Sequence, residues 1–141
     1  MSLIPYNEYL ETLPKQYKLL KIMRPPVYEI EISNNQLSTT AYYKDGSDKN
    51  YELKAKFSNR RLVIADFLLA VEALTDLLLK FPKHSFALNG FAIVNVTEEL
   101  ADGLTAIEIK VIREAFWAAS NKAKRRVISS KVHYQGQPIH Q

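Results

Sequence analysis

The chain has 141 residues, the size of a single domain, which buries about two thirds of the surface that its unfolded form would expose. It contains no cysteine, and this excludes a disulfide framework, a thiolate metal site and a cysteine nucleophile. A hydrophobic fraction of 47% and a charged fraction of 24% are typical of a globular protein, while the net charge of +4 permits an anionic partner without requiring one.

The N-terminal segment carries apolar residues at roughly helical spacing. It is interrupted at Pro14, is stopped by Pro25-Pro26, and contains Tyr6, Tyr9, Leu10, Leu13, Tyr17, Leu20 and Met23. We predict a helical arm over residues 1–26. Such an arm either covers an apolar face of its own chain or exchanges with a second chain, and the stiff proline joint favours exchange into a weak homodimer.

Three segments rich in β-branched and aromatic residues follow: VYEIEIS (27–33), QLSTTAYYK (36–44) and NYELKAKF (50–57). Asn34-Asn35 and residues 45–48 separate them, and Asn, Asp and Gly tolerate the backbone angles of tight turns. The pattern predicts an antiparallel meander of three strands.

A helical pattern begins at Leu62 and ends before Pro82. Its residues are apolar on most faces, so we expect a helix that is nearly all buried. The next segment, FALNGFAIVNV (86–96), predicts a buried strand with a turn or bulge at Asn89-Gly90.

A second helix is predicted after this strand. Either Asp102 caps it, or Thr105 caps it with Glu108 three residues later as a capping box. Its apolar stripe is expected to lie on the sheet and consists of Ala106, Ile109, Ile112 or Arg113, Phe116 and Trp117.

The segment RRVISSKV (125–132) predicts the last strand, and residues 133–141 are expected to form a disordered tail. The domain is therefore expected to cover residues 27–132, with the order βββαβαβ after the arm. No run reaches the ~18 apolar residues that a spanning helix needs, and the N-terminus lacks the basic region of a secretory signal. We expect a cytoplasmic protein without a transmembrane segment.

Three antiparallel strands followed by α-β-α-β is the order of the ribonuclease H-like fold, which is also the core of each lobe of the actin-like ATPases. Two sequence stretches strengthen this resemblance. GLTAIEIKVIREA (103–115) resembles a segment of the bacterial actin MreB, the rod shape-determining family, and VIADF (63–67), followed by Glu72 and Leu74 on the next helix, resembles that family's Val-Ile-Ala-Asp-Phe. The resemblance implies a mixed α/β sheet of the actin-like type.

The departures from this family concern the nucleotide site. In actin-like ATPases the first hairpin carries Asp-x-Gly-Thr, whose carboxylate organises a metal and whose backbone holds phosphate. Glu31, Ser33 and Asn34 stand there in this chain, without the glycine. We therefore expect a non-enzymatic single lobe with no cofactor. The resemblance implies that it acts through contacts with a protein partner, for instance a filament protein of the cell-shape cytoskeleton.

A metal-dependent nuclease on the same fold is the enzymatic alternative, because such an enzyme holds divalent metals with converging carboxylates. Its candidates are Glu31, Asp66 and Glu72. The competing interpretation places Glu31 in solvent, makes Asp66 a helix cap and puts Glu72 on the wet side of its helix. His84, His133 and His140 have no ligand spacing, so no metal site is expected.

A module that binds nucleic acid or another anionic surface is the second alternative. The residues that carry it are the basic cluster Lys122, Lys124, Arg125 and Arg126. The same cluster has a structural interpretation, because cations at a helix C-terminus are favoured by the helix dipole. Phe116 and Trp117 are predicted to be core residues rather than a stacking platform, so no specific nucleic acid is expected.

Overall fold

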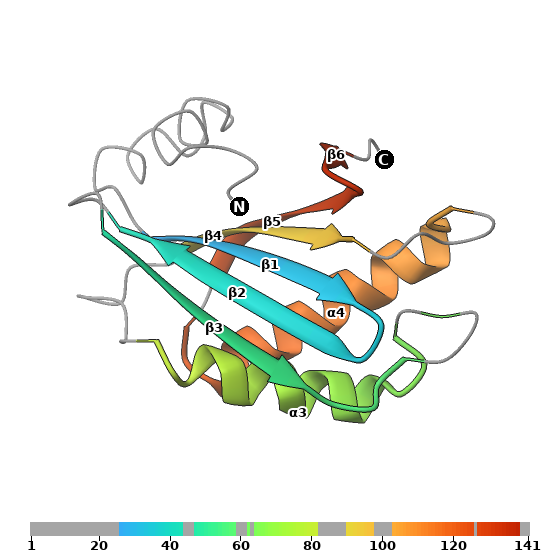
Figure 1. Cartoon of the computed structure of the whole chain (residues 1–141), viewed down its shortest axis with the longest axis horizontal. Coiled ribbons are helices and arrows are strands. Elements are labelled where there is room, and N and C mark those ends of the chain that lie inside the picture. Colours follow the sequence, from blue (N-terminus) through green and yellow to red (C-terminus); the bar gives the residue numbers. More distant parts are fainter. Residues whose placement is uncertain are drawn as a thin grey trace.

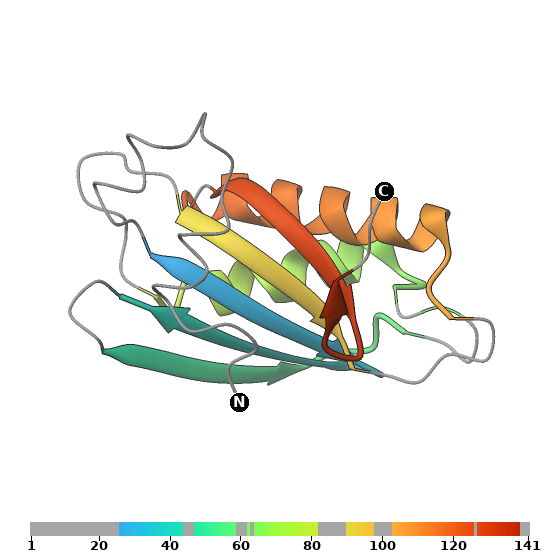
Figure 2. The same ribbon diagram turned by 90° about the horizontal axis from the view of Figure 1, so that it is seen from above.

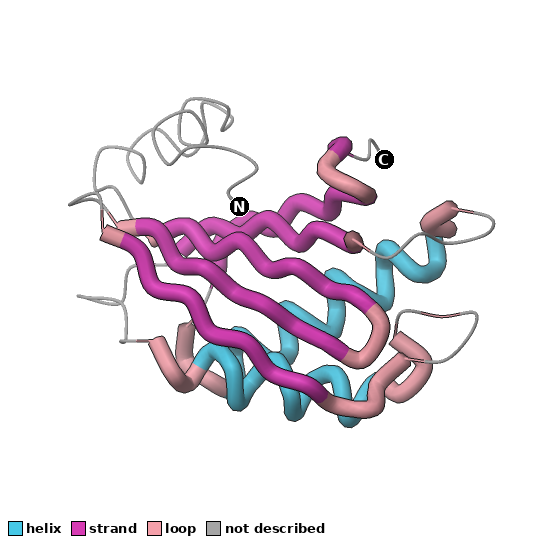
Figure 3. The backbone as a smooth tube through the Cα atoms, viewed as in Figure 1, coloured by secondary structure: helices cyan, strands magenta, loops and turns pink. Residues whose placement is uncertain are grey.

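The computed structural model describes residues 26–43, 47–58, 62, 64–81, 90–97, 103–125 and 127–138. The predicted helical arm, apart from Pro26, lies outside these residues. The described strands form one six-stranded sheet in the order β3 (Asp48–Lys54), β2 (Gln36–Tyr42), β1 (Val27–Ser33), β4 (Gly90–Val96), β5 (Val127–Tyr134) and β6 (Gln137–Pro138). The described helices, α3 (Phe67–Leu78) and α4 (Ala106–Lys122), lie side by side on one face of this sheet (Figures 1 and 2). Figure 3 separates the sheet layer from the helix layer by colour.

The first three strands form the predicted antiparallel meander. They are β1 (Val27–Ser33), β2 (Gln36–Tyr42) and β3 (Asp48–Lys54). The bounds of β1 agree with the prediction, whereas β3 lies a few residues earlier in the chain than predicted. Strand β3 ends at Lys54, the partner of Gln36, because β2 begins at Gln36 and Asn35 before it belongs to the β1–β2 turn.

Helix α3 (Phe67–Leu78) is buried along one side, through Ala70, Val71, Ala73, Leu74, Leu77 and Leu78. The expectation of a nearly all-buried helix is wrong, because Leu68 is 73% exposed and Leu79, at the C-cap, is 51% exposed. The reason is architectural. A helix in the outer layer of a two-layer domain meets the sheet on one side and solvent on the other, whatever its composition.

Strand β4 (Gly90–Val96) pairs in parallel with β1 and with β5 (Val127–Tyr134). The register between β4 and β5 shifts between Gly90 and Phe91, and the extra residue, Ile128, lies in β5 rather than in β4. The turn or bulge predicted at Asn89-Gly90 is therefore not confirmed, and Asn89 lies outside the described residues. Helix α4 (Ala106–Lys122) is capped by Thr105, whose side chain accepts from Glu108 N. Asp102, the other predicted cap, lies outside the described residues.

The prediction of a disordered tail from residue 133 is wrong as far as residue 138. Strand β5 continues to Tyr134, and a hairpin leads to β6 (Gln137–Pro138). Gln135 and Gly136 both have positive φ, of 49° and 81°, as the tightest hairpin turns require. Gln135 N also donates to Val96 O, so β4 holds this turn in place.

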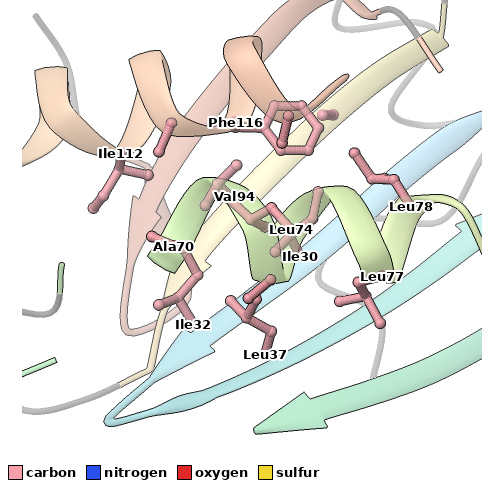
Figure 4. Packing of buried hydrophobic residues seen from close by; sticks show 14 of the residues in the cluster. Ile30, Ile32, Leu37, Ala70, Leu74, Leu77, Leu78, Val94, Ile112 and Phe116 are labelled. Carbon is pink, nitrogen blue, oxygen red and sulfur yellow. The ribbon is translucent and has the colours of Figure 1, made fainter. Parts of the chain in front are cut away.

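The core lies between the sheet and the two helices (Figure 4). Ile30 and Ile32 of β1 point into it beside Val94 of β4, and Leu74 of α3 and Phe116 of α4 close it from the helix layer. Each of these side chains is at most 1% exposed. Within the described residues, no helix combines the length and the apolarity that crossing a membrane requires.

Replacing Leu74 tests this core. We expect Leu74→Ala to lower the free energy of unfolding by about 2–5 kcal/mol, because it removes a buried side chain and leaves a cavity. Leu79→Ala is the matched control on the exposed side, with an expected effect below about 1 kcal/mol. Urea denaturation followed by circular dichroism measures both, and equal losses would contradict this packing.

Candidate functional site

The carboxyl end of the sheet is the natural place for a site. The parallel strands β1, β4 and β5 end there, and the β1–β2 turn and the first turns of α3 and α4 lie at the same end (Figure 1). In open α/β sheets, ligands bind outside the carboxyl ends of parallel strands. This end is also where the resemblance to actin-like ATPases implies phosphate binding.

The β1–β2 turn is bonded to a neighbouring loop of the protein. It consists of Asn34 and Asn35, since Ser33 already pairs with Gln36. Asn35 adopts a positive φ of 58°, which asparagine tolerates. Its N–H donates to Ser58 Oγ at 3.0 Å, and its Oδ1 accepts from Ser58 N at 2.8 Å. The amide of Asn35, which a phosphate loop would turn toward its ligand, is bonded inside the protein.

Each helix at this end is closed by its own cap. Asp66 Oδ1 accepts from Leu69 N at 3.1 Å, and Thr105 Oγ1 accepts from Glu108 N at 3.2 Å. The carboxylate of Asp66 thus takes the place at the N-terminus of α3 that a bound anion would occupy. Its negative charge opposes phosphate binding there.

An exposed apolar surface lies at the same end, and we name it the helix-end surface. It surrounds a groove of about 80 Å³ lined by Leu62, Ile64, Ile107, Glu108, Val111 and Ile112. Ile107 is 77% exposed and Leu62 is 39% exposed. The first turn of α3 adds three more exposed apolar residues: Phe67, Leu68 and Leu69. Exposed apolar residues that gather in one place are typical of binding surfaces.

Sequence reasoning missed this surface. Ile107 lies outside the apolar stripe predicted for α4. An isoleucine on the solvent-facing side of a helix could therefore have indicated this surface from the sequence. Leu68 gave no comparable signal, because it lies in a run where almost every residue is apolar.

The three candidate carboxylates of a nuclease site do not come together. Glu31 alternates along β1 with Ile30 and Ile32, which face the helices, so its side chain belongs to the opposite face of the sheet. Asp66 and Glu72 lie in the helix layer, where Asp66 is the cap of α3 and Glu72 is exposed. Among the described residues, no group of three or more His, Cys, Asp or Glu side chains is placed to hold a metal ion.

Arg125 joins the C-terminal ends of the two helices. It is buried, with Nε and Nη2 donating to Phe81 O at 3.1 and 2.6 Å and Nη1 donating to Ala123 O at 2.6 Å. Within the predicted basic cluster, Arg125 is therefore committed to backbone carbonyls rather than turned to an external anion. Lys122 and Lys124 are exposed, so an anion contact stays a prediction for them, and Arg126 lies outside the described residues.

The two aromatic residues of α4, Phe116 and Trp117, differ in their burial. Phe116 is 1% exposed, which confirms its prediction as a core residue. Trp117 is 65% exposed, so its prediction as a core residue is wrong. Adjacent residues on a helix point about 100° apart, and the stripe that meets the sheet continues from Phe116 to Ala119 and Ser120 instead.

His133 is a buried residue of β5 rather than part of a tail. It pairs in register with Asn95 of β4 and is 4% exposed, and its Nδ1 has no hydrogen-bond partner. Burial, and secondarily the positive charge of Lys131, lower the pKa of His133 below 6.5. The imidazole is therefore neutral at pH 7. His84 and His140 lie outside the described residues.

Comparison with known proteins identifies the fold. No family model matches the chain, and no curated protein matches it in sequence. Among solved structures, the chain is similar to the ethanolamine utilization protein EutJ from Carboxydothermus hydrogenoformans, with a TM-score of 0.51 and 10% sequence identity. The match covers 77% of this chain and 37% of EutJ, so the chain spans little more than a third of that protein.

EutJ has the actin-like ATPase fold, and the similarity shows that this chain has the fold of an actin-like, ribonuclease H-like lobe. The predicted fold class is thereby confirmed. At this level of identity the similarity concerns the fold alone, and it does not distinguish MreB from other actin-like proteins.

Replacing Arg125 tests its role at the helix ends. We expect Arg125→Met to lower the free energy of unfolding by about 1–3 kcal/mol, because it leaves buried carbonyls without their donor. Lys122→Met, an exposed change in the same cluster, is expected to change it by less than about 0.5 kcal/mol. Urea denaturation compares them, and a larger loss for Lys122→Met would refute the assignment.

The buried His133 predicts a loss of stability in acid. Because its pKa is lower in the folded chain than its ordinary value of 6.5, the unfolded chain binds the proton first as the pH falls. The contribution of His133 is complete above pH 6.5 and is lost as the pH falls from there toward the folded pKa. We expect a His133→Gln variant to lose less stability than the parent between about pH 7 and about pH 5 in urea denaturation. His84 and His140 are present in both proteins, so parallel losses would show that His133 is not the cause.

Proposed function

We propose that this chain is a non-enzymatic actin-like lobe that acts through protein contacts at its helix-end surface. The observation that carries the proposal is the exposed apolar groove between Leu62 and Ile107, at the end of the sheet where an ATPase of this fold would hold phosphate.

The hydrogen bonds of this end support the absence of nucleotide chemistry. Phosphate binding uses backbone amides that point outward and a positive local potential. In this chain Asn35 N is bonded to Ser58, and Asp66 brings a negative charge to the start of α3. The same end therefore favours an apolar partner over an anionic one.

The chemistry of the groove favours a protein as its occupant. Its lining is apolar except for Glu108 at the start of α4, so a matching ligand inserts apolar side chains and is not held by charge. The resemblance of residues 103–115 to MreB makes an actin-like filament protein of the cell-shape cytoskeleton the first partner to test.

Equilibrium dialysis of the full chain against radiolabelled ATP and magnesium tests the non-enzymatic part. We expect no retention at micromolar concentrations and no release of phosphate, because the amides and charges described above do not favour the phosphates. Micromolar binding accompanied by turnover would refute this part of the proposal.

Co-sedimentation with a purified bacterial actin-like filament protein tests the contact surface. We expect Ile107→Asp to weaken the interaction at least about tenfold, because it places a charge in the centre of an apolar contact. Leu79→Asp, at an exposed apolar position at the other end of α3, is the matched control and should bind like the parent. Failure of the parent to sediment would exclude this partner, and equal weakening by both variants would contradict the location.

A further inference from the structure

Part of the sheet face opposite the helices is also buried. Val27 of β1 and Phe91 and Ile93 of β4 alternate with the core residues of their strands, so their side chains belong to this second face. They are 2%, 0% and 1% exposed. Both described helices lie on the other face (Figure 2). The helices therefore do not account for the burial of these three residues.

The β5–β6 turn covers part of the second face. Gly136 N donates to Asn95 Oδ1 at 2.9 Å, so the turn reaches the carboxyl-terminal half of β4. Val27 and Phe91 lie at the opposite end of their strands, at the first paired positions of β1 with β4. Among the described elements, none is placed to cover this amino-terminal half.

We propose that the N-terminal segment, residues 1–25, covers this half of the second face within its own chain. The attachment point supports this occupant. Phe91 N donates to Pro26 O at 3.0 Å, so the chain enters β1 directly beside Phe91 and Val27. A segment tethered at the edge of the patch that it covers has a high effective concentration there, and no second copy has this advantage at ordinary concentrations.

The composition of the segment matches the face. Its apolar residues at helical spacing, such as Leu13, Tyr17 and Leu20, suit the patch of Val27, Phe91 and Ile93.

Adjacent residues of β4 provide the test, because the chain has no cysteine of its own. Ile93→Cys places a thiol on the second face, and Val94→Cys places one on the helix-covered face, in otherwise full-length protein. The rate of maleimide labelling is measured for each, with and without the arm substitutions Leu13→Ala and Leu20→Ala. We expect the arm substitutions to raise the rate at Ile93→Cys at least about tenfold and to leave Val94→Cys unchanged, because only the second face is opened.

Three other results would overturn the proposal. An unchanged rate at Ile93→Cys shows that the arm is not the cover, and a similar rise at both positions shows that the arm stabilises the whole domain rather than this face. The third concerns exchange between two chains. With the parent arm, the rate at Ile93→Cys should be the same between about 100 and about 1 μM protein, whereas a rate that rises on dilution shows a swapped dimer in place of contact within one chain.

Discussion

Strand β1 lies between β2 and β4 near the centre of the sheet, and its side chains are buried on both faces. Tyr28, Ile30 and Ile32 face the helices, and Val27 and Glu29 face the other way. The neighbouring strands are placed relative to this strand, because β2 joins it by a two-residue turn and β4 pairs with it in parallel. A parallel neighbour requires a crossover, and α3 is the helix of that crossover. Burial of β1 thus sets the positions of the meander and of the helix layer together.

The parallel pairing also brings the candidate site to one end of the molecule. Since β1, β4 and β5 run in the same direction, both helices start at the carboxyl ends of these strands. In an actin-like ATPase this arrangement gathers amides for phosphate. In this chain the backbone amides at this end donate to side chains of the protein itself. The acceptors are Ser58 at the β1–β2 turn, Asp66 at the start of α3 and Thr105 at the start of α4. The fold is that of an actin-like lobe, and the apolar side chains of the helix-end surface are exposed at the same end.

At the opposite end of the helix layer, the backbone carbonyls are bonded by the side chain of Arg125. Arg125 spreads its guanidinium over carbonyls that follow α3 and α4, and it does so in a buried position where those carbonyls have no access to water. One side chain from the α4–β5 connection therefore ties the ends of both helices together.

The burial of Tyr28 in the core raises the pKa of its phenol well above the ordinary value, so Tyr28 is neutral at physiological pH.

The sequence by itself determined the features that depend on neighbours in the chain. The residue pattern predicted the bounds of β1, and Thr105, one of the two predicted caps, marked the start of α4. Only the tertiary structure decided which side of each element faces the core. Leu68 and Trp117 are as apolar as their buried neighbours, and Arg125 is as basic as the lysines beside it. Their exposure or burial depends on the sheet and on the facing helix, which are contributed by residues distant in the chain. His133 became a buried strand residue for the same reason, since its partner Asn95 stands far earlier in the sequence.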